Sequence, residues 1–438
     1  MKSAQYIIIA FLCVVAVACN SDDDSPLRNA SPFVMAVSPL QGQPKDVIRI
    51  QGRNFSGIRE NNEVMFNDQA AVVIEANSHE LQVVVPSGEG EADVRVRVLG
   101  EEAQGTLASF TYLEPTDYVV ATVAGNSVYG LQDGTGPDAL FRNPEGVAIS
   151  PEGDIIVSDR ANNSIRKLTV EGAVTTILGD GSSGFVDGDL SSAKLSYPWK
   201  SCVDKDGNIY IADNRNHAIR KISTGGLVST LAGTGVAGFA DGAGAEAQFN
   251  APTDVDVDDN GVVYVADNAN HRIRKITPDG VVSTVAGDVS GFSDGEVATA
   301  LFKNPSGVSV DGEGNLYVAD RLNHRIRKID MTAGVVSTVA GAGTVGSRDG
   351  AANEAQFNNP YGLEVDDDGS IVVADLSNNK IRMVEEGNVS TIAGSTTGFL
   401  DGAGVVAKFS SPTDVTILDG VVYVADLGNH RVRKVYKK

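Results

Sequence analysis

The stretch that decides the fold is residues 255–287, VDVDDNGVVYVADNANHRIRKITPDGVVSTVAG. Four segments within it alternate apolar and polar residues, and turn sequences such as Asp-Asn-Gly and Pro-Asp-Gly separate them. Alternation with a period of two is the pattern of a strand with one buried face, and Asn, Asp and Gly favour the turns between strands. The stretch therefore predicts four short antiparallel strands.

The same unit recurs six times along the chain. Aligned on the Asp that ends the second expected strand, successive copies lie 54, 54, 53, 55 and 51 residues apart. The six aligned residues are Asp159, Asp213, Asp267, Asp320, Asp375 and Asp426. A four-stranded repeat of about 40–50 residues is typical of a propeller blade. The sequence therefore predicts an all-β, six-bladed propeller over residues 116–438.

The two ends of this region predict how the ring closes. The sixth copy stops at Val435, after its third strand, and a spare copy of the missing strand lies at residues 119–125. Closing a ring of strands removes an open sheet edge that would otherwise pair with other chains. We therefore expect the N-terminal strand to complete the sixth blade.

These units resemble the NHL repeat family. The sequence NHRIRKI is intact at 270–276 and 323–329, with close variants in the other four units, and the resemblance covers residues 119–438. It implies a propeller that binds protein, nucleic acid or glycan. A few members of the family are enzymes, such as the amidating lyase, which uses a metal at the propeller centre.

Residues 32–115 carry a different all-β pattern. Short alternating runs at 47–50, 71–74, 81–85 and 94–98 are separated by Pro and Gly turns, which predicts a β-sandwich. The pairs SP at 38–39 and VP at 85–86, with GRNF at 52–55, resemble the IPT/TIG immunoglobulin-like family. That resemblance implies a spacer or interaction module.

The N-terminus is interpreted as a lipoprotein signal peptide at residues 1–18. The apolar run from Tyr6 to Ala18 is shorter than the roughly 20 residues that span a bilayer, and it suits a signal peptide. The sequence AVAC at 16–19 resembles a bacterial lipobox, with Cys19 lipidated. The alternative is ordinary cleavage after Ala18.

An acidic tether at residues 19–31 follows. Its run NSDDD resembles the surface-export signal of Bacteroidota lipoproteins, and the alternative is a simple solvated linker. We expect a lipid-anchored outer-membrane protein that faces the cell exterior.

Composition excludes two classes of protein. Asp and Glu number 57 against 35 Lys and Arg, for a net charge of −22, whereas nucleic-acid binding needs a basic surface. Of three cysteines, Cys13 lies in the signal and Cys19 is the predicted lipid site, so Cys202 has no disulfide partner. A disulfide-stabilised scaffold is therefore excluded.

Residues repeated at one register are interpreted as scaffold. Histidines occupy the same turn in four units, and Asn163 and Asn379 replace them in the other two. These histidines are His217, His271, His324 and His430. The repeated Asp and an Arg seven residues later are expected to pair within each blade. The arginines are Arg166, Arg220, Arg274, Arg327, Arg382 and Arg433.

The long loop of each unit carries an Asp-Gly turn, preceded in four units by a Phe that we expect to pack between blades. The acids are Asp133, Asp187, Asp241, Asp294, Asp349 and Asp401, and the rings are Phe185, Phe239, Phe292 and Phe399. Calcium needs about six to eight converging oxygens, so one Asp per blade does not predict a calcium site.

Positions at which the units differ are the candidate ligand site. The two residues after each loop Pro enter the inner strand at the mouth of the central channel. Candidate ligand-binding residues there are Trp199, Lys200, Tyr361, Glu145, Asp254 and Asp414. Trp199 is the only tryptophan, and we expect its ring to face the mouth, where a sugar can stack on it. The alternative is a Trp that closes the channel structurally. Arg160, Arg215 and Arg321 are further candidates for this face.

Three functions fit this sequence. The first is recognition of an extracellular ligand, a glycan, with the sandwich as spacer. The second is a lactonase, lyase or hydrolase at the propeller centre, although no Ser-His-Asp order, HExxH or phosphate loop occurs. The third is a protein-interaction scaffold. No cofactor is predicted, and a bound calcium or other metal stays open. Expected partners are a glycan or protein ligand, the outer membrane and an outer-membrane transporter complex, with no nucleic acid.

Overall fold

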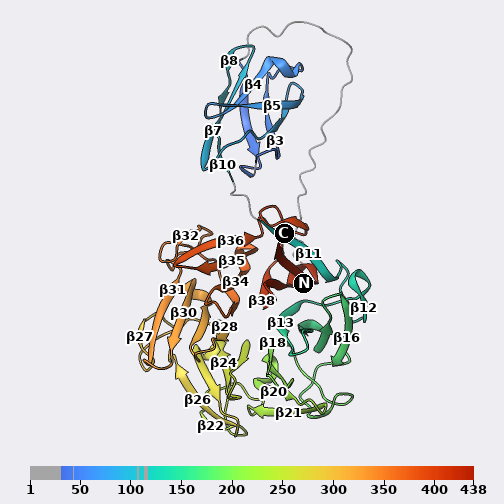
Figure 1. The fold of residues 1–438 in the computed structure, drawn as a ribbon, viewed down its shortest axis with the longest axis vertical. Coiled ribbons are helices and arrows are strands. Elements are labelled where there is room, and N and C mark those ends of the chain that lie inside the picture. The colour runs from blue at the N-terminus through green and yellow to red at the C-terminus, as the bar shows by residue number, and fades with distance from the viewer. Residues whose placement is uncertain (1–30, 43, 106–107, 113–116) are drawn as a thin grey trace, which may run out of the picture. The chain divides into compact units, whose positions relative to one another are not determined.

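The computed structural model describes residues 31–42, 44–105, 108–112 and 117–438. It divides into two compact units, residues 1–114 and 115–438, and both are built from strands (Figure 1). The expected signal peptide, Cys19 and nearly all of the acidic tether lie outside the described residues. The helical elements of the described segments are single 3₁₀ turns, and none could cross a membrane.

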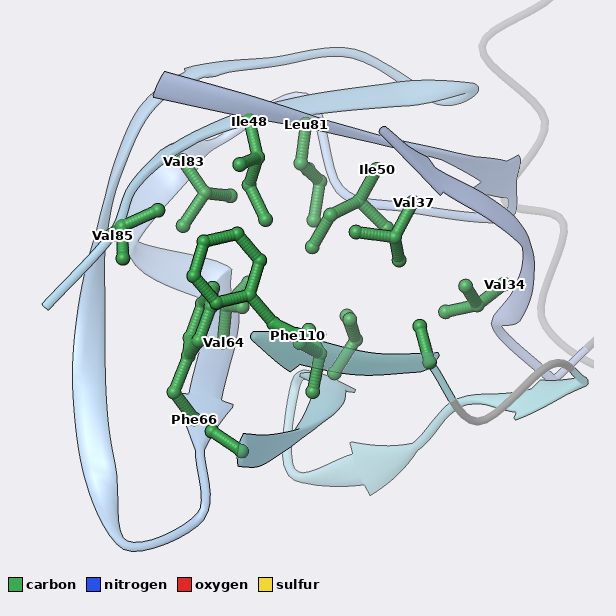
Figure 2. Close-up of a cluster of buried hydrophobic side chains, with 14 of the residues drawn as sticks. Val34, Val37, Ile48, Ile50, Val64, Phe66, Leu81, Val83, Val85 and Phe110 are labelled. Atoms are coloured by element: carbon green, nitrogen blue, oxygen red, sulfur yellow. The ribbon is translucent and has the colours of Figure 1, made fainter. Parts of the chain in front are cut away.

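The first unit is a β-sandwich. Its strands are β1(Phe33–Ser38), β2(Gln41–Gly42), β3(Val47–Arg53), β4(Asn62–Phe66), β5(Gln69–Ala76), β6(Glu80–Val84), β7(Glu91–Val98), β8(Glu101–Glu102), β9(Gln104–Gly105) and β10(Ala108–Tyr112), with one turn, η1(Arg59–Asn61). Alternate residues of β3 point inward, so Ile48 and Ile50 are buried in the core shown in Figure 2. Phe66 and Phe110 meet edge to face there, with ring centroids 5.2 Å apart.

The second unit is a ring of six sheets, each with four main strands and a two-residue outer strand. In order from the inner strand, they are β13(Pro144–Ile149), β14(Ile155–Asp159), β15(Ser164–Leu168), β16(Ala173–Leu178) and β12(Gly134–Thr135) in blade one; β18(Pro198–Val203), β19(Ile209–Asp213), β20(Ala218–Ile222), β21(Leu227–Ala232) and β17(Gly188–Asp189) in blade two; and β23(Asp254–Val257), β24(Val263–Asp267), β25(Arg272–Ile276), β26(Val281–Ala286) and β22(Gly242–Ala243) in blade three.

Blades four to six follow the same order. They are β28(Pro305–Val310), β29(Leu316–Asp320), β30(Arg325–Asp330), β31(Val335–Ala340) and β27(Gly295–Glu296); β33(Pro360–Val365), β34(Ile371–Asp375), β35(Lys380–Glu385), β36(Asn388–Ala393) and β32(Gly350–Ala351); and β38(Pro412–Leu418), β39(Val421–Asp426), β40(Arg431–Lys437), β11(Tyr118–Gly125) and β37(Gly402–Ala403). The predicted all-β propeller with six blades is confirmed.

The ring closes as the sequence predicts. Strand β11 pairs antiparallel with β40, with Val120 opposite Val435, and with the outer strand β37. In Figure 1 the teal β11 lies among the red strands of the C-terminal blade. The sixth blade is thus assembled from both ends of the propeller region.

Apolar clusters bind each blade to the next. Ile156 and Ile165 of blade one pack with Ile209 and Ile211 of blade two, and every one of these side chains is buried. Because the same kind of cluster recurs around the ring, the propeller has its core between blades rather than at its centre.

The repeated Asp and Arg pair within each blade, as expected. In blade one, Arg166 Nη1 donates to Asp159 Oδ2 at 2.9 Å, and Arg166 Nη2 donates to Asp133 Oδ1 at 2.8 Å. The buried guanidinium therefore holds both the second strand and the Asp-Gly turn of the long loop. All six blades repeat this network.

The repeated His or Asn joins neighbouring blades. His271 ends the 3₁₀ turn η5(Asn268–Asn270) with a left-handed φ of 58°. Its Nδ1 accepts a hydrogen bond from the backbone N–H of Asn304 in the next blade, at 3.1 Å. Where Asn163 stands instead, its Oδ1 accepts from the N–H of Tyr197 at 2.9 Å. The scaffold interpretation of these residues is confirmed.

The prediction for the loop phenylalanines is wrong. Phe239 is 46% exposed, and the other three rings are exposed to a similar extent. The guanidinium carbon of Arg272 lies 3.9 Å from the centroid of the Phe239 ring. A flat cation stacked on the ring lets the Phe stay at the surface, because it covers one apolar face without a neighbouring blade.

Candidate ligand-binding site

The inner strands converge on one channel, and every inner strand but β23 begins at the loop Pro. Alternate residues of a strand share a face, so the side chains two and four residues after each Pro both face the channel. The labels β13, β18, β28 and β38 in Figure 1 mark inner strands around the middle of the ring. The position directly after Pro lies at the channel mouth.

Glu145, Trp199 and Tyr361 meet at the mouth. Glu145 is 1% exposed, and its Oε2 lies 2.7 Å from Arg160 Nη1. The rings of Trp199 and Tyr361 are tilted, with centroids 6.5 Å apart. Burial raises the pKa of Glu145, although Arg160 opposes that shift, and burial raises the pKa of Tyr361 well above its ordinary value. Of the three side chains, only that of Trp199 is part-exposed.

One layer deeper, Lys200 crosses the channel. Its Nζ lies 3.0 Å from Asp254 Oδ2 and 3.1 Å from Asp414 Oδ1, and all three side chains are buried. Each carboxylate also accepts a backbone N–H from the next blade, Val308 for Asp254 and Val147 for Asp414, both at 3.0 Å. Burial opposes the charge on Lys200, but the two carboxylates outweigh it, so its pKa is raised.

Glycines at the equivalent positions give this lysine room. A Cβ on Gly146 would lie 2.8 Å from the Lys200 Cα, and one on Gly362 would clash with Asp414 Oδ1. Gly307 is the third glycine at this level, so three blades supply no side chain there and Lys200 reaches two acids. The Lys200–Asp254–Asp414 triad links the inner strands of blades two, three and six across the channel.

A second group of channel residues was missed from the sequence. Below the triad, a cavity of about 110 Å³ is lined by Cys202, Asp256, Glu364 and Thr416, among others. Burial raises the pKa of Asp256 to about 7 and that of Glu364 well above its ordinary value. The signal was available, because these residues lie two places beyond Lys200, Asp254, Gly362 and Asp414 on the same strand face.

The structure brings all six predicted site residues together, but five of them are buried against each other. The charged groups and the hydroxyl of these five interact with other groups of the protein. The five are Glu145, Lys200, Tyr361, Asp254 and Asp414. Trp199 alone keeps part of its surface open, and its Nε1 is buried without a hydrogen-bond partner. The accessible chemistry of this end is therefore the exposed part of the Trp199 indole together with the loops around it.

Those loops add aromatic and cationic groups. Tyr197 precedes the Pro of blade two, and the guanidinium carbon of Arg215 lies 3.5 Å from the centroid of its ring. Arg321 lies over Tyr361 at 5.1 Å and Arg160 over Trp199 at 5.9 Å. No group of three or more His, Cys, Asp and Glu in the described segments is arranged to hold a metal ion.

Comparison with known families agrees with both halves of this architecture. Residues 32–112 match the IPT/TIG domain, and residues 141–168, 195–222, 249–276, 302–329 and 409–435 match the NHL repeat. The chain carries an IPT/TIG domain and an NHL-repeat propeller. The NHL match omits blade five, which has the same strands and the same Arg382–Asp375 pair as the others.

Two curated relatives are similar to more than half of this chain. Protein SUPPRESSOR OF QUENCHING 1, chloroplastic, from Arabidopsis thaliana is 30% identical over 285 residues, which is 61% of this chain and 27% of that protein. NHL repeat-containing protein 2 from Homo sapiens is 30% identical over 289 residues, 57% of this chain and 40% of that protein. The chain thus spans less than half the length of these relatives.

Solved structures share the fold across both units. An auxiliary nutrient binding protein from Bacteroides thetaiotaomicron has a TM-score of 0.57 and 18% identity, covering 94% of this chain and 99% of that one. A protein described in the same words from Bacteroides ovatus has a TM-score of 0.57 and 18% identity, covering 93% of this chain and 98% of that one. At this identity the likeness concerns the fold.

Proposed function

We propose that this protein is a cell-surface lipoprotein whose NHL propeller recognises an extracellular glycan at the channel mouth, with the IPT/TIG domain as spacer. The observation that carries the proposal is the part-exposed indole of Trp199 at that mouth, where the Arg160 guanidinium lies against both this ring and that of Tyr197. An aromatic face with polar groups around it is the surface on which the apolar face of a sugar stacks.

Two further observations support the proposal. Solved structures that share both units are described as auxiliary nutrient binding proteins. The sequence AVAC at 16–19 and the acidic run after it supply an anchor and a tether. Under this proposal the protein sits on the outer membrane, faces outward, and delivers its ligand to an outer-membrane transporter complex.

A glycan array followed by calorimetry on the purified chain tests the binding claim. Trp199→Ala is expected to weaken glycan binding by about tenfold, because it removes the aromatic surface on which the sugar stacks, and stacking of a nucleobase on one such ring contributes on the order of 1–3 kcal/mol. Phe185→Ala is the matched control, because that ring lies in the same blade but away from the inner strand and is 41% exposed. Undiminished binding by the Trp199 variant would refute the site.

A labelling experiment tests the anchor. Cells expressing the wild-type chain are expected to incorporate labelled palmitate into it, and Cys19→Ala is expected to abolish the label. Cleavage of the anchored protein by protease added to intact cells checks the outward face. Label that persists in the Cys19 variant, or protection from protease, would contradict that part of the proposal.

A further inference from the structure

The two ends of the propeller channel carry opposite charge. The mouth is bordered by two sets of loops, the segments before the inner strands and the 3₁₀ turns after the second strands. These mouth loops are residues 141–143, 195–197, 249–251, 302–304, 357–359 and 409–411, and residues 160–163, 214–217, 268–271, 321–324, 376–379 and 427–430. They contain no Asp or Glu, although the chain has a net charge of −22. They contain five cations, Arg142, Arg160, Arg215, Lys303 and Arg321.

The opposite end is acidic. The loops between inner and second strands are residues 150–154, 204–208, 258–262, 311–315, 366–370 and 419–420. Five of these six loops carry two or three carboxylates each, and their only cation is Lys205. The loops at the far end of the channel are thus acidic and the segments that border the mouth are basic, so an anion approaching the channel itself is favoured at the mouth.

The two sets of mouth loops form one surface. The N–H of Arg215 donates to Ser196 O at 3.2 Å, and the N–H of Leu322 donates to Lys303 O at 3.1 Å. Across blades, Asn214 Nδ2 donates to Pro252 O at 2.9 Å. These bonds hold the cations around the start of the inner strands, where Trp199 lies.

Most of these cations have no partner of opposite charge. Among the described residues, only Arg160 has a carboxylate within ion-pair distance, and that is the buried Glu145. Arg142, Arg215 and Lys303 are exposed. The buried groups without a hydrogen-bond partner in this region are of both kinds, the donors Arg160 Nε and Arg321 Nε and the acceptors Glu145 Oε2 and Asn359 Oδ1. Arg142, Arg215 and Lys303 are therefore exposed cations with no carboxylate of the described segments within ion-pair distance.

We propose that the mouth binds the anionic groups of an acidic saccharide, a carboxylate or sulfate ester on a sugar chain. A guanidinium presents a planar fork of donors that matches such an oxyanion in two parallel hydrogen bonds. Arg215 stacks on Tyr197 and is held in place by it, so an anion gains a fixed partner while the sugar ring covers Trp199. This inference rests on the proposed function and names its ligand class.

Calorimetry with four defined probes tests the inference. The probes are oligogalacturonate for carboxylate, a κ-carrageenan oligosaccharide for sulfate, a neutral malto-oligosaccharide and a single-stranded DNA oligonucleotide, all of similar length. We expect at least one acidic saccharide to bind about tenfold or more tighter than the neutral one, since hydrogen bonds to charged groups are the stronger ones. This preference should weaken as salt is raised.

Paired variants separate charge from fold. Arg215→Gln combined with Arg321→Gln should remove the preference for the acidic saccharide. Lys205→Gln, the matched control at the acidic end of the same blade, should keep it. Equal binding of neutral and acidic saccharides, or an unaffected double variant, would overturn the inference and leave glycan recognition standing. If no saccharide bound, both proposals would be refuted. If only the DNA bound, the ligand class would be a nucleic acid and the inferred saccharide would be wrong.

A measurement without any ligand gives an independent readout. Trp199 is the only tryptophan, so the tryptophan fluorescence of the whole chain reports on the mouth. A basic mouth concentrates iodide and excludes caesium, so iodide is expected to quench this emission more strongly. The double arginine variant should reduce the difference between quenching by iodide and quenching by caesium, and Lys205→Gln should leave that difference unchanged. Equal quenching by both ions in the wild type would overturn the inferred charge of the mouth.

Discussion

His271 Nδ1 accepts a hydrogen bond from the backbone N–H of Asn304, 3.1 Å away in the next blade. The relationship explains why four histidines stand at one register without forming a metal site. The position requires a left-handed residue with an acceptor that reaches the next blade, and His and Asn both meet that requirement. A repeated histidine that resembles a metal ligand in the sequence therefore joins neighbouring blades by a hydrogen bond, and this contact is called a joint below.

Replacing this histidine tests the joint. His271→Ala is expected to lower the free energy of unfolding by about 1–2 kcal/mol, because it loses a hydrogen bond and places a non-Gly residue without a polar side chain in the left-handed region. His271→Asn should cost less than about 0.5 kcal/mol, since blades one and five already use Asn. Equal losses for both variants in thermal unfolding would contradict the joint.

The same joints predict a pH dependence. Burial lowers the pKa of His217, His271, His324 and His430. With the folded pKa below the unfolded value of about 6.5, the contribution is complete above pH 6.5 and is lost as pH falls through the lowered pKa. A variant with Asn at all four positions should therefore lose less stability than the wild type between pH 7 and 5. Parallel curves for the two proteins would argue against histidine as the source.

The Lys200 triad predicts a large effect from one substitution. Lys200→Met leaves Asp254 and Asp414 buried without their cation, which is expected to cost about 3–5 kcal/mol at neutral pH. The loss should be smaller at pH 6, because burial already raises the pKa of Asp414 to about 7 and protonation removes the unpaired charge. Adding Asp254→Asn and Asp414→Asn should restore much of the stability. A Lys200→Met variant with the same Tm as the wild type would contradict the buried ion pairs of Lys200 with Asp254 and Asp414.

The acidic cavity predicts a pH dependence opposite to that of the histidines, with stability lost as pH rises. Burial raises the pKa of Glu364, with Asp256 nearby. A raised folded pKa means that stability is complete below the unfolded pKa and is lost as pH rises through the folded pKa. Glu364→Gln should therefore raise Tm at pH 8, by on the order of 2 °C, and change it less at pH 5.5. Asp367→Asn, exposed in the same blade, is the control, and an equal gain in both variants would point to net charge instead.

Closure of the ring makes a further prediction. Replacing residues 116–125 with a Gly-Ser linker removes β11, exposes the edge of β40 and unpairs β37. Tm is expected to fall by roughly 10 °C or more, because a whole strand of blade six is lost. An unchanged Tm would show that the sixth blade does not need its N-terminal strand.

Much of this fold can be predicted from the sequence because each blade repeats one period-two pattern. The same pattern places Trp199 at the mouth and Lys200 in the channel. The burial of Lys200 could not be predicted, since it depends on which blades face each other across the channel and on Gly146 leaving space. Asp256 was missed although its spacing from Asp254 was visible. Three of the four exposed loop rings have an arginine stacked on them, Arg272, Arg325 or Arg431, a contact that alternation does not encode.

The central claim is that an acidic glycan binds at the channel mouth against Trp199. The most direct test is a fluorescence titration of the wild-type chain with the acidic saccharide that binds best in calorimetry, since the only tryptophan lies at that mouth. The account predicts a saturable change in Trp199 emission with the same Kd as calorimetry, absent with the neutral saccharide. Binding by calorimetry that leaves the emission of Trp199 unchanged would place the ligand elsewhere and contradict the account.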